Sequence, residues 1–246
     1  MGRTLIKRFG ISIMVMAFSA CVQNPAVVEV EREERQQHTQ LAAQSLDFEV
    51  MNNIDPEETN DLVLTLYRNP VSRVRVIDFF VALTGSQQIA QTVLQYADEY
   101  NISPTLAFAL SWVESRYNPY AVNHNSRSID RGLFQLNSRS FPELGIEDFF
   151  DITTNVVNAM EYLSFCLEEG ETEVVALAMY NAGRRGVDTG TPRSTLVYIS
   201  RILDYHAELE ANFSEHMWRL SKRNQELRER SEISYRLVVD EQTLLK

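Results

Sequence analysis

The sequence is poor in the residues that break helices or cross-link chains. Its 246 residues include only 9 glycines, 7 prolines and 2 cysteines. So few helix breakers favour a largely helical protein, and two cysteines cannot supply a disulfide framework. The sequence also has no HExxH motif and no zinc-type spacing of cysteine and histidine. We therefore expect no metal site and no other cofactor.

Basic residues are also in the minority. Lysine and arginine number 23 against 34 aspartates and glutamates, which gives a formal net charge of -11. A nucleic-acid-binding protein normally carries a basic patch, so we expect no nucleic-acid partner. With 44% hydrophobic residues, the chain can build one medium-sized domain with a real core, plus tails.

No apolar run is long enough to cross a bilayer comfortably. The longest, "FGISIMVMAFSA" over residues 9–20, follows three basic residues and ends in small residues. This pattern is typical of a secretory signal peptide over residues 1–20. The protein is therefore predicted to be exported.

Cys21 directly follows the small residues that end this run. Small residues before a cysteine resemble the lipobox of bacterial lipoproteins, although Phe18 stands where leucine is usual. The resemblance implies a lipid on Cys21 that holds a periplasmic protein to the membrane; a plain signal peptide with an incidental cysteine is the alternative. Residues 21–55 are then an anchor and a flexible, charged tether. Cys166 would have no disulfide partner and is expected to be buried.

The remaining sequence has helical periodicity with clear end signals. Order is expected to begin near residue 56, and residues 56–85 form N-terminal helices that pack on the main domain. Ser86 is expected to cap the next helix, and Ser103 with Pro104 to begin a short, almost wholly apolar and therefore buried helix. That helix must end before Asn118-Pro119.

A loop-rich stretch over residues 118–150 follows, with short strands expected around "RGLFQL" at 131–136. Three further amphipathic helices are predicted over residues 153–170, 172–183 and 193–210, the first two ended by Gly170 and Gly183. Residues 211–246 form a charged helical tail of unknown role. Its apolar residues keep no heptad, so we do not expect a coiled coil.

Glu114 is the most informative single residue, because it stands at the end of the apolar helix. It lies one turn after Leu110 and two turns after Ala107, so it shares a side with buried residues. An apolar wall disfavours the charged carboxylate and raises its pKa. A carboxyl that keeps its proton near neutral pH can act as a general acid.

Three later segments join Glu114 in a recognisable order. The first is "ESRYNPYA" at 114–121, the second "GLFQL" at 132–136, and the third "ALAMYNAG" at 176–183. A tyrosine in the following helix, Tyr198, completes the set. Together these segments resemble the catalytic domain of lytic transglycosylases, lysozyme-like enzymes that cut the glycan strands of peptidoglycan.

This resemblance implies a fold and a reaction. The fold is mainly α, a lysozyme-like helical domain of the goose-type lysozyme and soluble lytic transglycosylase kind, with a small loop or β-hairpin region, here over residues 86–210. Glu114 would be the general acid and base that cleaves the bond between N-acetylmuramic acid and N-acetylglucosamine and leaves a 1,6-anhydro end. The partner would be peptidoglycan glycan strands.

The resemblance also assigns supporting roles. Ser115 and Gln135 would hold the sugar near the scissile bond. Tyr180 and Tyr198 would point their hydroxyls at the glutamate or the substrate, and Asn181 would order the helix end beside them.

Asp130 is a candidate second carboxylate. It stands two residues before Gly132, which resembles the position of the second catalytic aspartate in animal-type lysozymes. If it faces Glu114, the enzyme could be a hydrolytic muramidase; otherwise we expect Asp130 to pair with Arg127 or Arg131 in the loop. A third alternative is a non-catalytic lipoprotein that only binds peptidoglycan.

Overall fold

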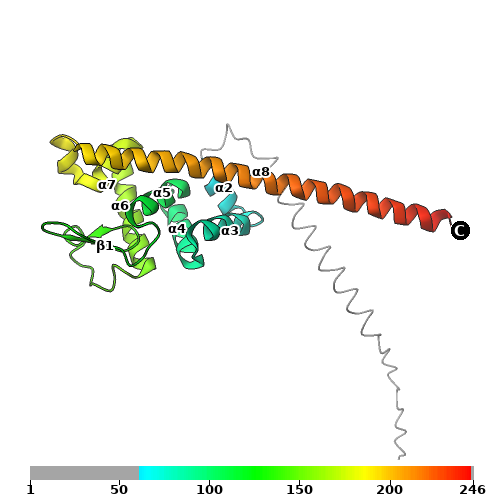
Figure 1. The fold of residues 1–246 in the computed structure, drawn as a ribbon, viewed down its shortest axis with the longest axis horizontal. Helices are drawn as coiled ribbons and strands as arrows, with labels where there is room; N and C mark the ends of the chain where they lie inside the picture. The colour runs from blue at the N-terminus through cyan, green and yellow to red at the C-terminus, as the bar shows by residue number, and fades with distance from the viewer. Residues whose placement is uncertain (1–60, 245–246) are drawn as a thin grey trace, which may run out of the picture. The chain divides into compact units, whose positions relative to one another are not determined.

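The structure is a computed structural model that describes residues 61–244, with side chains described up to Ser231 and at Ile233. The predicted signal peptide, Cys21, the tether and residues 56–60 lie outside the described residues. The helices are α2 (Leu62–Arg68), α3 (Arg73–Thr84), α4 (Gln87–Glu99), α5 (Pro104–Ser115), α6 (Ile152–Gly170), α7 (Glu173–Asp188) and α8 (Arg193–Leu244). Strands β1 (Val122–His124), β2 (Ile129–Arg131) and β3 (Leu136–Asn137) form one antiparallel sheet in that order. The predicted fold class, mainly α with a small β region, is confirmed (Figure 1).

Helix α5 is the buried helix that its composition predicts. Every residue from Pro104 to Ser111 is buried, as expected for a helix that is apolar on all sides. Pro104 occupies the first turn, as predicted, but the Ser103 side chain does not cap the helix. The Ser103 hydroxyl makes no capping bond and instead lies 2.9 Å from the Thr105 hydroxyl. The local hydroxyl partner competes with the backbone for the serine oxygen.

The end of α5 is set by backbone conformation. Arg116 and Tyr117 both have positive φ, at 56° and 62°, and the Arg116 amide donates to the carbonyl of Trp112. Two left-handed residues in succession stop the helix before Asn118-Pro119 is reached. Glu114 is thereby left in the last turn of α5, directly before the chain changes direction.

One hydrophobic core joins the helices on both sides of α5. Phe80 of α3 stacks on Phe108 of α5, with ring centroids 4.1 Å apart, and also on Phe213 of α8. Helices α6 and α7 pack on each other, and α5 packs on α8. The core thus reaches beyond the predicted limits of the catalytic domain at residues 86 and 210.

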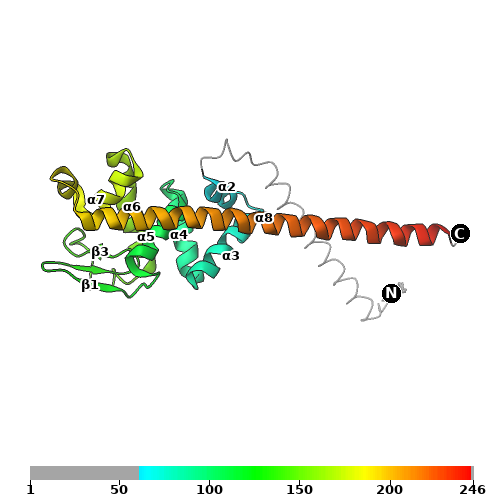
Figure 2. The ribbon, with the colours of Figure 1, turned by 45° about the horizontal axis from the view of Figure 1, so that its top comes forward.

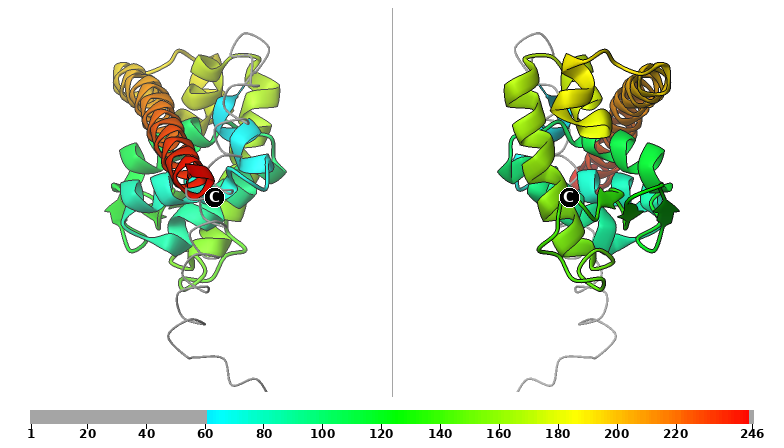
Figure 3. Two further views of the ribbon diagram at one scale, coloured as in Figure 1. Left: turned by 90° about the vertical axis from the view of Figure 1, so that its right-hand side faces the viewer. Right: turned by 90° about the vertical axis from the view of Figure 1, so that its left-hand side faces the viewer.

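Helix α8 is a single element of 52 residues that crosses the predicted boundary at residue 210. Its sequence contains neither glycine nor proline, so nothing local ends the helix. Leu209, Phe213 and Met217 are buried, and the described side chains beyond Asn224 are at least partly exposed. The other helices lie along its N-terminal half, which Figures 1 and 2 show from two directions and Figure 3 shows end on.

Helix α6 ends at Gly170 as predicted, whereas the predicted helix end at Gly183 needs correction. Gly170 is still helical, and Glu171 takes the left-handed conformation with φ 60°. A Cβ at Gly170 would lie 2.8 Å from the amide nitrogen of Ala176, so this glycine allows α6 and α7 to approach closely. At Gly183 the backbone leaves helical geometry, with φ 71° and ψ 161°, but the helix resumes to Asp188.

None of the helices within residues 61–244 combines the length and the apolar character that crossing a membrane requires.

Candidate active site

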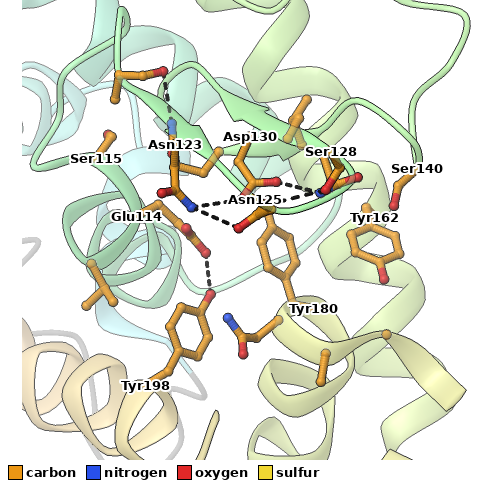
Figure 4. A pocket seen from close by; sticks show the side chains of 18 of the residues that line it. Glu114, Ser115, Asn123, Asn125, Ser128, Asp130, Ser140, Tyr162, Tyr180 and Tyr198 are labelled. Carbon is orange, nitrogen blue, oxygen red and sulfur yellow. Dashed lines mark hydrogen bonds between the residues drawn. The ribbon is translucent and has the colours of Figure 1, made fainter. Parts of the chain in front are cut away.

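A cleft of about 1040 Å³ opens where α5 ends. Its walls come from the last turn of α5, the β-sheet with its connecting turns, the segment after β3, the middle of α6, the break in α7 and the first turns of α8. Glu114, Ser115, Asp130, Gln135, Tyr180, Asn181 and Tyr198 all line it. The structure therefore brings every site residue predicted within the described part of the chain to one cleft (Figure 4).

Glu114 is a half-buried carboxyl with a strongly altered pKa. Burial raises its pKa from 4.5 to about 8, and the negative charge of Asp130 adds to the rise. The hydrogen bond from Tyr198 acts in the opposite direction, because it stabilises the ionised form. Burial outweighs the hydrogen bond, so Glu114 carries its proton at neutral pH and can donate it.

Tyr198 is the residue that contacts this carboxyl directly. Its hydroxyl donates to Oε1 of Glu114 at 2.5 Å. Burial, and then the charge on Glu114, hold the pKa of Tyr198 well above 10.0, so the phenol remains a donor. The start of α8 is fixed beside it, because the Thr195 hydroxyl donates to Oδ1 of Asn181 in α7 at 2.8 Å. This hydrogen bond joins Asn181 beside the break in α7 to the start of α8.

Tyr180 lines the cleft and contacts the backbone of the protein. Its hydroxyl donates to the backbone carbonyl of Phe134 at 3.2 Å, and no bond joins it to Glu114. Its ring packs against the hydrophobic core. Tyr180 therefore connects α7 to the turn that contains "GLFQL".

Ser115 and Gln135 also make their hydrogen bonds inside the protein. The buried Ser115 hydroxyl lies 2.7 Å from the Leu133 carbonyl, and the Gln135 side-chain amide donates to the carbonyls of Ala121 and Gly132 at 3.0 and 2.9 Å. Both residues therefore hold the wall of the cleft together. The Ser115 hydroxyl and the Gln135 amide, which were predicted to contact the sugar, donate to backbone carbonyls in this structure.

The turn that these bonds hold requires a glycine. Gly132 has φ 81°, and a Cβ there would lie 2.0 Å from the Phe149 carbonyl oxygen and 2.3 Å from Nδ2 of Asn155. Asn155 is a supporting residue that the sequence did not reveal. Fully buried in α6, it donates to the Phe149 carbonyl at 2.9 Å and accepts from the Phe134 amide at 2.8 Å. No local pattern marks it, since two of its three partners, Arg131 and Phe134, lie more than twenty residues away in the sequence.

Asp130 faces the cleft within a group of asparagine amides. Asn125 and Asn137 donate to its two oxygens at 2.7 and 2.6 Å, and Asn123 donates at 3.2 Å. Two of these contacts follow from strand register, because Asp130 pairs with Asn123 across β1–β2 and with Asn137 across β2–β3. Figure 4 shows Asp130 with Asn123 and Asn125 in the cleft that Glu114 also lines.

The predicted ion pair of Asp130 with Arg127 or Arg131 is therefore wrong for the residues that the structure describes. The guanidinium of Arg131 lies over the ring of Phe149 at 5.3 Å instead. The Asp130 carboxylate is held by neutral amides and makes no ion pair among the described residues.

Metal binding has no support in the described part of the chain. Residues 61–244 contain no cluster of three or more histidine, cysteine, aspartate or glutamate side chains that could hold an ion. Cys166 is a buried free thiol, as predicted.

Comparison with known proteins identifies the region around this cleft. The profile of the family described as "Transglycosylase SLT domain" matches residues 91–192, a span that includes Glu114, the β-sheet and Tyr180. The chain is 32% identical over 111 residues to X polypeptide of Escherichia coli, which is 42% of this chain and 65% of that protein. It is 30% identical over 121 residues to X polypeptide of Escherichia coli strain K12, which is 46% of this chain and 71% of that protein.

Proposed function

Because the chain belongs to the transglycosylase SLT domain family, we propose that it is a peptidoglycan lytic transglycosylase with Glu114 as its general acid and base. The observation that carries the proposal is the half-buried Glu114 carboxyl, whose pKa is raised to about 8 and whose oxygen accepts a hydrogen bond from Tyr198. It is an acid that is protonated at neutral pH and held in a fixed orientation at the edge of a large cleft.

The reaction follows from this arrangement in two steps. Glu114 first gives its proton to the oxygen of the bond between N-acetylmuramic acid and N-acetylglucosamine, and the carbon–oxygen bond breaks. The resulting carboxylate then takes the proton of the muramoyl 6-hydroxyl, whose oxygen closes on C1 to form the 1,6-anhydro ring. An internal nucleophile needs no bound water and loses little entropy on reacting. One carboxyl is therefore sufficient, whereas most glycosidases use two.

Hydrolysis is the second candidate, and the position of Asp130 favours it. Asp130 lines the same cleft as Glu114 and has no cation paired with it among the described residues. Such a carboxylate could direct a water molecule to C1 or stabilise the positive charge that develops there. The two reactions leave different ends on the glycan.

Mass spectrometry of the products distinguishes them. Purified peptidoglycan digested by a lytic transglycosylase yields muramoyl ends that are lighter by one water than the reducing ends left by a hydrolase. We expect anhydro ends. Reducing ends alone would instead establish the muramidase reaction.

The Glu114→Gln variant tests the assignment of the acid. Glutamine keeps the shape but cannot donate the proton, and general acid catalysis contributes about 10²–10⁴ in rate. We expect cleavage to fall by that factor while binding to insoluble peptidoglycan is kept. Glu168→Gln, an exposed glutamate on α6, is the control and should cleave normally. A wild-type protein that binds but never cleaves would support the non-catalytic alternative.

We further propose that the protein is exported and anchored in the periplasm by a lipid on Cys21. The proposal is supported by the basic start, the apolar run over residues 9–20 and the cysteine that follows it. Labelling with a radioactive fatty acid should mark the wild-type protein and leave Cys21→Ser unlabelled. Equal labelling of both would contradict the anchor.

A further inference from the structure

The cleft is an exception to the acidic character of the chain. Five charged side chains line it: the carboxyls of Glu114 and Asp130 and the guanidinium groups of Arg116, Arg139 and Arg201. Cations therefore outnumber carboxyls in the cleft, although acidic residues exceed basic ones by 11 in the whole chain. Since Glu114 is protonated at neutral pH, the excess of positive charge in the cleft is larger than this count suggests.

These three arginines have no carboxylate partner among the described residues. Arg116 lies over the ring of Trp112, with its guanidinium carbon 4.4 Å from the ring centre, and this contact leaves its positive charge uncompensated. All three side chains are exposed. Arg184 and Arg219, by contrast, are paired with Glu169 and Glu215. The three arginines thus leave their positive charges available where the substrate is proposed to bind.

The three arginines come from different parts of the fold. Arg116 follows Glu114 by two residues at the end of α5, and Arg201 follows Tyr198 by three residues on α8, so it lies on the same side of that helix. Arg139 comes just after β3, from the wall that carries Asp130. Three elements therefore each place one guanidinium at the cleft.

We propose that Arg116, Arg139 and Arg201 bind carboxylates of the peptidoglycan strand and so select strands that carry them. The inference rests on the proposed function, since it concerns the substrate of the same cleft. The planar guanidinium presents paired N–H donors that match a carboxylate. Peptidoglycan offers carboxylates from two sources. They are the stem peptides on intact strands and the lactyl groups that remain on muramic acid when the peptides have been removed.

Three substrates distinguish these sources for the full-length protein: intact strands, strands stripped of peptides by an amidase, and intact strands whose carboxylates have been converted to amides with carbodiimide and ammonia. We expect the wild-type kcat/KM to fall about tenfold on the amidated strands. We expect high salt to weaken cleavage of the intact strands more than cleavage of the amidated strands, because salt screens exposed charges.

The triple variant Arg116→Gln/Arg139→Gln/Arg201→Gln should lose about tenfold in kcat/KM on carboxylate-bearing strands and nothing on amidated strands. Each single exchange should cost about twofold, within the range of exposed ion pairs, so that the three together account for the loss in the triple variant. If the triple variant loses kcat/KM on intact strands alone, the arginines bind the carboxylates of the stem peptides. If it also loses kcat/KM on stripped strands, they bind the carboxylates of the lactyl groups as well. The triple lysine variant should recover part of the activity, and Arg219→Gln on α8 should behave as wild type.

Unchanged kcat/KM of the triple variant on both intact and stripped strands would overturn the inference. If the wild type cleaves none of the substrates, the proposed function fails instead. Cosedimentation with insoluble peptidoglycan then still tests the arginines. Binding that is equal for native and amidated peptidoglycan, or for the wild type and the triple variant, would also reject the proposed role of the arginines.

Discussion

The Tyr198 hydroxyl and the Glu114 carboxyl, 84 residues apart in the sequence, are joined by a hydrogen bond of 2.5 Å. This bond connects the start of α8 to the last turn of α5. It holds one carboxyl oxygen in place and favours the ionised form, while burial favours the protonated form more strongly. The pKa of Glu114 is thus set by two opposing causes that mutations can separate.

Tyr198→Phe removes the hydrogen bond and should raise the pKa of Glu114 further. The general acid loses its proton on the alkaline side of the pH profile, so that limb of kcat/KM should move to higher pH. The maximal rate should fall about tenfold, because the carboxyl also loses its fixed orientation. Tyr180→Phe is the control, since its hydroxyl contacts the Phe134 carbonyl. A limb that moves equally in both variants would contradict this prediction.

Asp130→Asn should move the same limb in the opposite direction. The negative charge of Asp130 raises the pKa of Glu114, so a neutral amide at this position should lower it and bring the alkaline limb to lower pH. The exposed Asp204→Asn variant makes the same change in net charge outside the cleft and should leave the limb in place. Complete loss of cleavage in Asp130→Asn would support the hydrolytic reaction instead.

Gly132→Ala should destabilise the protein by about 3 kcal/mol or more. The new methyl group would meet the Phe149 carbonyl and Asn155, and the residue would also hold a positive φ that alanine disfavours. Gly85→Ala is a matched control, because Gly85 has φ 69° and no atom within 4 Å of an added Cβ. It should cost only the backbone strain, about 1–2 kcal/mol. Urea denaturation of both variants measures the difference.

The position of Glu114 at the cleft could be predicted from the sequence, whereas the contacts around the cleft could not. Glu114 could be found because a local pattern places it: an apolar helix, one carboxyl at its end and then a chain reversal. Asp130 could not be placed, because its amide partners are neighbours only once the strands have paired. Asn155 escaped notice for the same reason, since its hydrogen bonds join α6 to a distant turn.

The helix ends differ in the same way: an end set by a short-range contact could be predicted, and an end without a local signal could not. Ser86 caps α4 as predicted, with its hydroxyl accepting from the Ile89 amide, because that contact involves residues three apart. The left-handed Arg116 and Glu171 carry no such signal, since neither residue type favours positive φ by itself. Tertiary packing determines these two ends.

Ser115→Ala tests whether this serine is a structural contact or a sugar ligand. Its buried hydroxyl lies within hydrogen-bonding distance of the Leu133 carbonyl, and losing that bond should lower the free energy of unfolding by about 1–2 kcal/mol. Ser140→Ala, an exposed hydroxyl in the same cleft, should change it by less than about 0.5 kcal/mol. A higher KM with unchanged stability would instead make Ser115 a ligand of the sugar.

Glu114→Gln should be more stable than the wild type at alkaline pH, and the difference should depend on pH in a defined direction. The Glu114 carboxyl has a pKa of about 8 in the folded protein and 4.5 as the ordinary value that the unfolded chain restores. Between these values the folded state holds a proton that the unfolded state has released, so the free energy of unfolding of the wild type falls as pH rises. Glutamine does not titrate, so the free energy of unfolding of the variant does not fall in this way as pH rises.

Denaturant titrations of both proteins at pH 4, 6 and 9 measure the effect. Their free energies of unfolding should be closest at pH 4 and should separate by about 2–4 kcal/mol at pH 9, with the variant the more stable. The exposed Glu168→Gln variant should follow the wild type at every pH. A difference that does not change between pH 4 and pH 9 would mean that Glu114 is ionised in the folded protein at neutral pH. The carboxyl that the proposed reaction uses as its acid would then have no proton to give.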